Sequence, residues 1–136
     1  MRLSAKAEYA CLALLELART QSEDAPRRAR EIADAHEIPE RYLVQIFQQL
    51  KGAGLVYSAR GSTGGYRLAR PADAITVAEV LAVIDGPSDP PRGPRPAASQ
   101  ALAELIDEAR TAYRRILMGT SLAELAGRTS SHDWVL

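Results

Sequence analysis

Between Pro39 and Pro71 the spacing of the apolar residues changes from a helical to a strand-like period. The first part has apolar residues at i, i+3, i+4 and i+7, which predicts a helix with one buried face. These residues are Leu43, Ile46, Phe47 and Leu50. Proline is favoured at the first helical position, so we expect the helix to begin at Pro39 and to run to about Lys51, before Gly52 and Gly54.

The second part predicts a two-stranded hairpin, a wing, over residues 55–69. Apolar residues alternate with polar ones on both sides of the glycine-rich segment 60–65. They are Leu55, Tyr57 and Ala59 before it, and Tyr66 and Leu68 after it. Two helices followed by such a hairpin indicate a winged helix-turn-helix. A phosphate-binding loop is disfavoured, because the segment enters a strand and not a helix and lacks the Lys-Ser/Thr pair.

Five further helices are expected outside this segment. Apolar spacing and caps predict helices over residues 5–19, with Ser4 as the N-cap, over 27–36, and over 76–85 with a Thr76/Glu79 capping box. Five of the eight prolines fall between Pro87 and Pro96, which favours a loop over 87–97. We therefore expect a winged helix-turn-helix domain at 1–86, the Pro-rich loop, a long helix with a short following helix at 98–128, and a tail at 129–136. In the tail, Trp134 is a candidate anchor.

The charges of residues 41–72 point to a polyanionic partner. This stretch carries five basic side chains and no acid, although the whole chain has a formal net charge of zero. The basic residues are Arg41, Lys51, Arg60, Arg67 and Arg70. In a winged helix-turn-helix, the second helix of the pair enters the major groove of DNA and a basic wing lies along the backbone or the minor groove. A solvated helix face is the alternative for the helix taken alone.

Other classes of function find little support in the sequence. The 136 residues contain no long apolar run and no signal peptide pattern, so we expect a soluble cytoplasmic protein that does not span a membrane. Cys11 is the only cysteine, and His36 and His132 do not form a metal-binding pattern with it. No nucleophile elbow or carboxylate pair is present. We expect neither an enzyme nor a bound metal.

Three segments together resemble the Rrf2 family of bacterial transcriptional regulators. They are MRLSAKAEYACLALLELA, IADAHEIPERYLVQIFQQLKGAGLVYSARGSTGGYRLARP and TVAEVLAVIDG, within residues 1–86. The resemblance implies a mainly α protein with a small β-hairpin wing. It also implies a homodimer that binds pseudo-palindromic double-stranded DNA, usually as a repressor. The controlling signal, a small molecule or a partner protein, cannot be named from these residues.

The resemblance also assigns DNA contacts to the predicted helix 39–51 and to the wing. The helix residues are Pro39, Glu40, Arg41, Tyr42, Val44 and Gln45, with Lys51 at its end. The wing residues are Arg60, Ser62, Gly64 and Arg67. Val44 departs from the polar or acidic residue of similar regulators, and a valine packs on a thymine methyl group where a carboxylate would accept from cytosine. Lys51 and Arg67 are expected to contact phosphate or nothing.

The long helix carries an apolar seam at alternating three- and four-residue steps. Its members are Leu102, Leu105, Ala109, Ala112 and Ile116. The resemblance implies that this helix crosses to a partner subunit, and packing on the same chain is the alternative. A second function class also stays open: an interaction module that keeps a winged-helix shell but acts through this helix and the Pro-rich loop.

The resemblance fails at the Pro-rich loop. Cluster-binding members carry three closely spaced cysteines between the fourth helix and the dimer helix, because thiolates hold iron and sulfide. No cysteine occurs between Pro87 and Leu102 here. Glu8 stands near a position from which some members donate a ligand, but we expect it in a salt bridge or on a solvated face. Cys11 is expected to be a buried, inert thiol. The prediction is a regulator without a cofactor.

Overall fold

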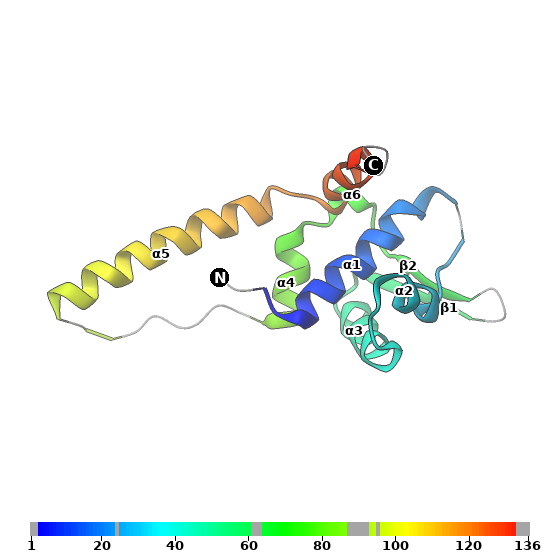
Figure 1. Ribbon diagram of the computed structural model, residues 1–136, viewed down its shortest axis with the longest axis horizontal. Helices are drawn as coiled ribbons and strands as arrows, with labels where there is room; N and C mark the ends of the chain where they lie inside the picture. The colour runs from blue at the N-terminus through cyan, green and yellow to red at the C-terminus, as the bar shows by residue number, and fades with distance from the viewer. Residues whose placement is uncertain (1–2, 24, 61–63, 87–92, 95, 133–136) are drawn as a thin grey trace.

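The computed structural model of the chain describes residues 3–23, 25–60, 64–86, 93–94 and 96–132. Within these ranges it is mainly α-helical with one β-hairpin (Figure 1). The helices are α1 (Ala5–Arg19), α2 (Ala29–His36), α3 (Glu40–Gly52), α4 (Val77–Asp85), α5 (Ala97–Met118) and α6 (Leu122–His132). The hairpin consists of β1 (Val56–Ala59) and β2 (Gly65–Leu68), and the short 3-10 helices are η1 (Gln21–Glu23) and η2 (Ala72–Ala74).

The core is built around α1. This helix contacts α2, α3, α4, α6 and β2 (Figure 1). Its buried face contains three alanines, Ala7, Ala10 and Ala13, which let neighbouring helices approach closely, and the larger Leu14 and Leu17. The opposing side of the core includes the fully buried Phe47, Leu43, Ile46 and Leu50 of α3. The stripe expected on that helix is therefore confirmed.

Local capping explains several of the helix boundaries. The Ser4 hydroxyl accepts a hydrogen bond from the Ala7 amide at 3.0 Å, and α1 spans the expected residues 5–19. The Thr76 hydroxyl accepts from the Glu79 amide at 3.2 Å and starts α4. The Glu79 carboxylate, which would complete a capping box, instead pairs with Arg70 at 2.6 Å.

Three expected boundaries were wrong by a few residues. The helix expected from 27 begins at Ala29, because the backbone of Arg27 pairs with β2 and cannot be helical. Pro39 is the N-cap of α3 and not its first residue. The expected tail contributes residues 129–132 to α6. The proposed anchor Trp134 lies outside the described residues.

The first strand of the wing presents a different face to the core than the sequence pattern suggested, whereas the second strand agrees with it. The strands pair antiparallel, with Val56 opposite Leu68 and Tyr57 opposite Arg67. Val56 and Leu68 are buried, whereas Tyr57 is 46% exposed. Leu55 is buried too, but its amide donates to the Leu50 carbonyl in the turn that follows α3. In β1 the alternation therefore starts one residue later than expected, because Leu55 precedes the strand.

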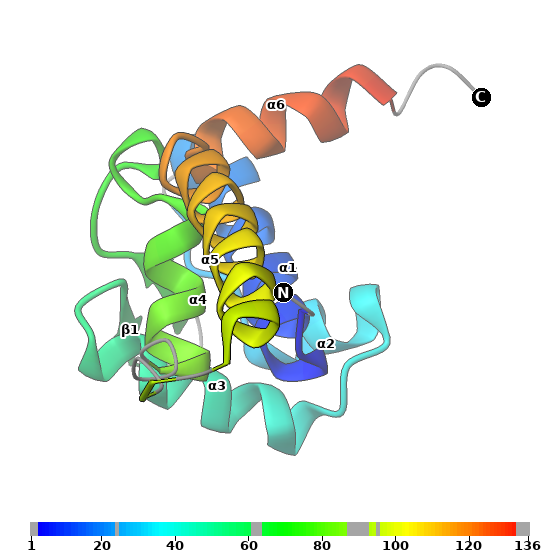
Figure 2. The ribbon, with the colours of Figure 1, turned by 90° about the vertical axis from the view of Figure 1, so that its left-hand side faces the viewer.

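The long helix α5 projects from the rest of the molecule (Figures 1 and 2). It contacts α4, but none of its 22 residues is buried. Packing on the same chain therefore leaves most of its apolar seam uncovered. None of the described helices is both long enough and apolar enough to cross a bilayer.

Candidate DNA-binding surface

Helices α2 and α3 form a helix-turn-helix with a tight connection. Glu37 ends α2 in the left-handed conformation, with φ of 55°, and the Ile38 amide donates to the Ala33 carbonyl at 2.9 Å. Ile38 is 4% exposed, so its side chain fixes the turn to the core. Pro39 then accepts from the Leu43 amide and starts α3. The sequence EIPE thus sets how α3 is oriented relative to α2.

The face of α3 opposite its buried stripe is polar and open to solvent. Glu40, Arg41 and Gln45 are exposed in the first two turns, and Gln48, Gln49 and Lys51 extend this face. Such side chains can donate to and accept from base edges in the major groove. The geometry therefore suits an element that reads DNA with its N-terminal half.

Two of the expected contact residues are less accessible. Tyr42 is half-buried, and its ring packs edge-on against Tyr9 of α1, with ring centroids 5.8 Å apart. Val44 is also half-buried. Tyr42 thus ties α3 to α1, and only part of its side chain is open to a ligand.

The wing is fixed to α3 and to the segment before α2. The rings of Phe47 and Tyr66 stack with centroids 4.2 Å apart. The Tyr66 amide donates to the Arg27 carbonyl at 2.7 Å, and the Arg27 amide donates to the Tyr66 carbonyl at 3.0 Å. Gly65 lies so close to Arg27 that an added Cβ would be 2.5 Å from its carbonyl oxygen. The ring stacking and the backbone pairing therefore fix the orientation of the wing relative to α3.

A buried acid, Glu16, joins three elements beneath this surface. Glu16 is 8% exposed, and its Oε1 lies 3.0 Å from both Arg19 Nη1 and His36 Nε2. Its Oε2 lies 3.5 Å from Arg27 Nη1. The cluster connects α1, the end of α2 and the backbone that pairs with the wing. We did not expect it, although an acid among the apolar positions of the α1 stripe is a signal for a buried ion pair.

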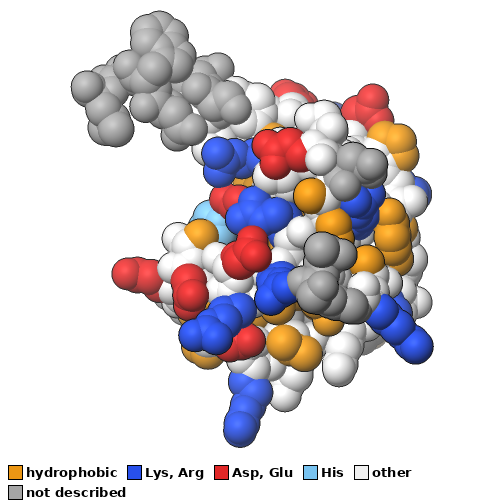
Figure 3. Space-filling view, turned by 90° about the vertical axis from the view of Figure 1, so that its right-hand side faces the viewer, with side chains coloured by type: hydrophobic (Ala, Val, Ile, Leu, Met, Phe, Trp, Pro, Cys, Tyr) orange, Lys and Arg blue, Asp and Glu red, His pale blue; other side chains and the backbone are white. Residues whose placement is uncertain are grey.

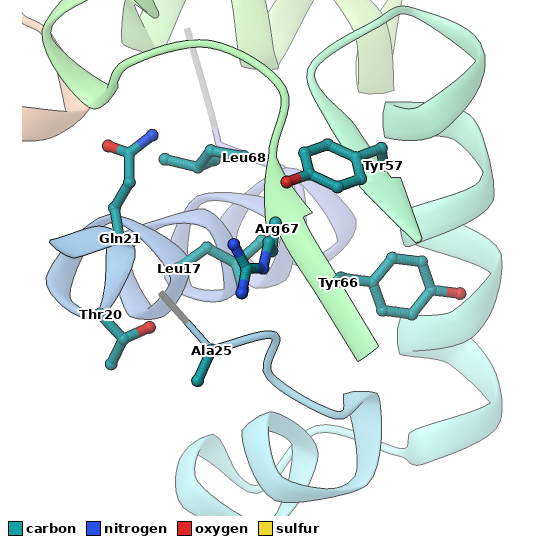
Figure 4. A pocket seen from close by; sticks show the side chains of 8 residues that line it. All are labelled: Leu17, Thr20, Gln21, Ala25, Tyr57, Tyr66, Arg67 and Leu68. Atoms are coloured by element: carbon teal, nitrogen blue, oxygen red, sulfur yellow. The ribbon is translucent and has the colours of Figure 1, made fainter. Parts of the chain in front are cut away.

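The basic residues of segment 41–72 have different surroundings. Lys51 Nζ donates to the Ser58 hydroxyl at 3.1 Å, which links the end of α3 to the wing. Arg67 is half-buried in the wall of a hollow of about 120 Å³ between the end of α1 and the wing (Figure 4). Arg70 pairs with Glu79. Although segment 41–72 contains no acid, the fold thus brings an acid from outside the segment, Glu79, to one of its basic residues.

Arg41 and Arg60 remain as exposed cations on the α3 and wing side. Figure 3 looks onto the end of the molecule that carries the wing, and Lys and Arg side chains lie on this face among Asp and Glu side chains. Gly64 is buried immediately before β2. Ser62, an expected contact, lies outside the described residues.

The Cys11 thiol is poorly suited to bind a metal. Burial, followed by the charges of Asp85 and Glu8, raises its pKa to about 11. A thiol ligand must lose its proton, so this environment opposes ligation. Within the described parts of the chain, no group of three or more His, Cys, Asp or Glu side chains could hold a metal ion.

The Rrf2 family model, described as an iron-dependent transcriptional regulator, matches residues 3–128. The chain belongs to the Rrf2 family. The regulator CymR of Bacillus subtilis is 36% identical over 133 residues, which cover 98% of this chain and 95% of CymR.

Solved structures agree with this membership. The structure of CymR, the global cysteine regulator of B. subtilis, superposes with a TM-score of 0.84 at 34% identity and covers 94% of this chain and 98% of that chain. The structure of T. potens IscR superposes with a TM-score of 0.82 at 26% identity and covers 100% and 93% of the two chains. The expected winged-helix fold is confirmed, and the relatives are transcriptional regulators, not enzymes.

The iron in the family description does not fit the donor groups of this chain. An iron–sulfur cluster is held by several thiolates, and the sequence provides one cysteine, whose raised pKa opposes ionisation. Glu8 is exposed on α1 beside it. One thiol and one carboxylate do not make a cluster site.

Proposed function

We propose that the protein is a homodimeric transcriptional repressor that works in the bacterial cytoplasm without an iron–sulfur cluster. It reads a pseudo-palindromic operator with α3 and the wing. One observation carries the proposal: the polar face of α3 is exposed next to a wing that stacking and backbone pairing hold in place. An exposed polar helix face and a fixed basic hairpin together form a surface that fits the major groove and the adjoining backbone.

The residues of this surface take separate roles. Arg41 and Gln45 read base edges near the start of α3, flanked by Pro39 and Glu40, while Val44 and the outer edge of Tyr42 offer apolar contact to a thymine methyl group. Arg60 probes the minor groove from the base of the wing, supported by Ser62 and Gly64. Lys51 and Arg67 contact phosphate, and Lys51 keeps two donors beyond its bond to Ser58.

A fluorescence anisotropy titration with the DNA upstream of the protein's own gene tests the proposal. Affinity should fall as salt rises, because phosphate contacts release counterions. Arg41→Ala or Gln45→Ala should each weaken binding by about 1–3 kcal/mol if the side chain makes a base contact. Gln100→Ala, a matched change of an exposed glutamine on α5, should leave binding unaltered.

Charge reversal separates this function from that of an interaction module. Arg41→Glu combined with Arg60→Glu should abolish sequence-selective binding and relieve repression of a reporter. An interaction module that acts through α5 and the Pro-rich loop would keep its activity in this variant. Unchanged DNA binding by the variant would overturn the proposal.

A further inference from the structure

The hollow between the end of α1 and the wing has a volume of about 120 Å³ (Figure 4). Leu17 and Leu68 give it an apolar wall, and Arg67 is the one charged side chain among the described residues that line it. A cavity of about 150 Å³ holds a benzene molecule, whereas drug-sized ligands need about 300–1,000 Å³. The hollow therefore fits a molecule of only a few carbon atoms.

The walls of the hollow are held in place by the protein itself. On the α1 side, Gln21 Nε2 donates to the Arg70 carbonyl at 3.0 Å, and Gln21 Oε1 accepts from the Ala72 amide at 3.0 Å. On the wing side, the backbone of Tyr66 pairs with that of Arg27. The hollow is thus preformed, and residues of α1 and of both wing strands line it.

Arg67 and Tyr57 bring hydrogen-bond donors to the hollow. They lie directly opposite each other in the hairpin, so their side chains leave the same face of the wing. Arg67 is half-buried, and a cation that is partly shielded from water attracts an anion more strongly than a fully solvated one. Arg67 also has another contact within the chain, but a guanidinium with five N–H donors can keep it while binding a carboxylate.

The lining also restricts the kind of anion that fits. An amino acid would bring an ammonium group, and no acid is among the described lining residues to pair with it. Inorganic phosphate or sulfate would place charged oxygen atoms against Leu17 and Leu68, whose side chains offer no hydrogen bond. A short monocarboxylate places its single charge on Arg67 and its hydrocarbon chain on the two leucines.

We propose that the hollow binds a small monocarboxylate, with the carboxylate on Arg67 and the hydrocarbon chain against Leu17 and Leu68, and that this ligand weakens DNA binding. The effect on DNA rests on the proposed function, in which Arg67 contacts a phosphate. A bound carboxylate neutralises the guanidinium and occupies the donors that a phosphate needs. The ligand and one DNA phosphate therefore compete for the same side chain.

Ligand binding is measured first on the full chain without DNA, by calorimetry and by the amide resonances in NMR spectra. The probe is 3-methylbutanoate, and 3-methylbutanamide, which has the same shape without the charge, is the matched ligand. The carboxylate should bind at least about tenfold more tightly than the amide, because it forms charged hydrogen bonds. Equal affinities, or resonance shifts confined to residues away from the hollow, would overturn the site.

Variants assign the binding to Arg67. Arg67→Ala should abolish binding of the probe, and Arg67→Lys, which keeps the charge but loses the bidentate geometry, should weaken it. Lys51→Ala is the matched control, because Lys51 is a cation beside the wing that does not line the hollow, and it should bind the probe as the wild type does. Wild-type probe affinity in Arg67→Ala and Arg67→Lys would refute the assignment. Circular dichroism verifies that each variant is folded.

The competition with phosphate is tested by the salt dependence of DNA affinity. Saturating probe, compared with sodium chloride at equal ionic strength, should lower the slope of log affinity against log salt by about 0.9 for each subunit, the loss of one phosphate contact. The probe should have no effect on the slope in Arg67→Ala. It should still lower the slope in Lys51→Ala, which has lost a different phosphate contact.

The results also separate this inference from the proposed function. A chain that binds the probe through Arg67 but binds no DNA would overturn the proposed function and leave the carboxylate site standing. A chain that binds its operator but not the probe would overturn the site alone. An unchanged or higher DNA affinity with saturating probe would overturn the competition for Arg67.

Discussion

The backbone pairing of the wing with Arg27 requires a glycine at position 65. The φ of Gly65 is 151°, and a Cβ there would lie 2.5 Å from the Arg27 carbonyl oxygen and 3.1 Å from the Arg27 nitrogen. Backbone atoms cannot yield as a flexible side chain can. The two hydrogen bonds between Arg27 and Tyr66 require this close approach.

Gly65→Ala should therefore lower the free energy of unfolding by about 1–3 kcal/mol, from strained backbone and lost pairing. Urea denaturation measures the change. Gly52→Ala is the matched control: an added Cβ there meets no atom within 4 Å, and the position is helical, so the protein should be stabilised by about 1 kcal/mol or less. Equal effects of the two substitutions would contradict the close approach at Arg27.

At the scale of elements, Glu16 connects α1 to both parts of the candidate DNA-binding surface. Its carboxylate lies 3.0 Å from His36 at the end of α2 and 3.5 Å from Arg27, whose backbone pairs with the wing. Arg27 has a second acidic neighbour in Glu31, at 3.3 Å. Removing Glu16 would therefore leave His36 and Arg19 without this carboxylate while Arg27 keeps an acidic neighbour.

Glu16→Gln should lower the free energy of unfolding by about 1.5–3 kcal/mol, the contribution of hydrogen bonds to a charged, mostly buried group. It should also speed hydrogen exchange at the Tyr66 amide, because the Arg27 backbone becomes less restrained. Glu124→Gln breaks an exposed pair with Arg128 at 3.0 Å and should cost less than about 1 kcal/mol. Exchange at Tyr66 that stays as slow as in the wild type would count against the coupling.

The sequence predicted those elements whose signals are local. Helix α1 was predicted to the residue because Ser4 and the stripe behind it lie within a few turns, and the buried stripe of α3 identified its exposed face as well. The wing was placed correctly, and so was the buried Leu68 of β2, but the inward face of β1 was not, since Leu55 belongs to the preceding turn. The Glu16 cluster, the Arg27 pairing and the contact of Tyr42 with Tyr9 depend on residues far apart in the chain. The spacing of residues along the sequence does not predict contacts between residues so far apart.

At the scale of the whole molecule, the proposed operator recognition would depend on the distance between two copies of α3. In a two-fold symmetric dimer, the two recognition helices meet successive major grooves about 34–36 Å apart. The α3 and wing surface lies away from the projecting end of α5 in Figure 1. Joining two chains through α5 would therefore leave both surfaces open to DNA.

Ile116→Asp should separate the proposed dimer and abolish the advantage of a full operator over a half-site. Each of two isoleucines loses about 1.5–3 kcal/mol of burial, so the dimer dissociation constant should rise at least about 100-fold. Met118→Asp is the matched control, because Met118 is 59% exposed near the same end of α5 but lies off the seam. Sedimentation and titrations with full and half operators measure both effects. If Ile116→Asp keeps full-operator affinity while Met118→Asp loses it, the contact surface is a different face of α5, and the spacing of the two α3 helices must be set from that face.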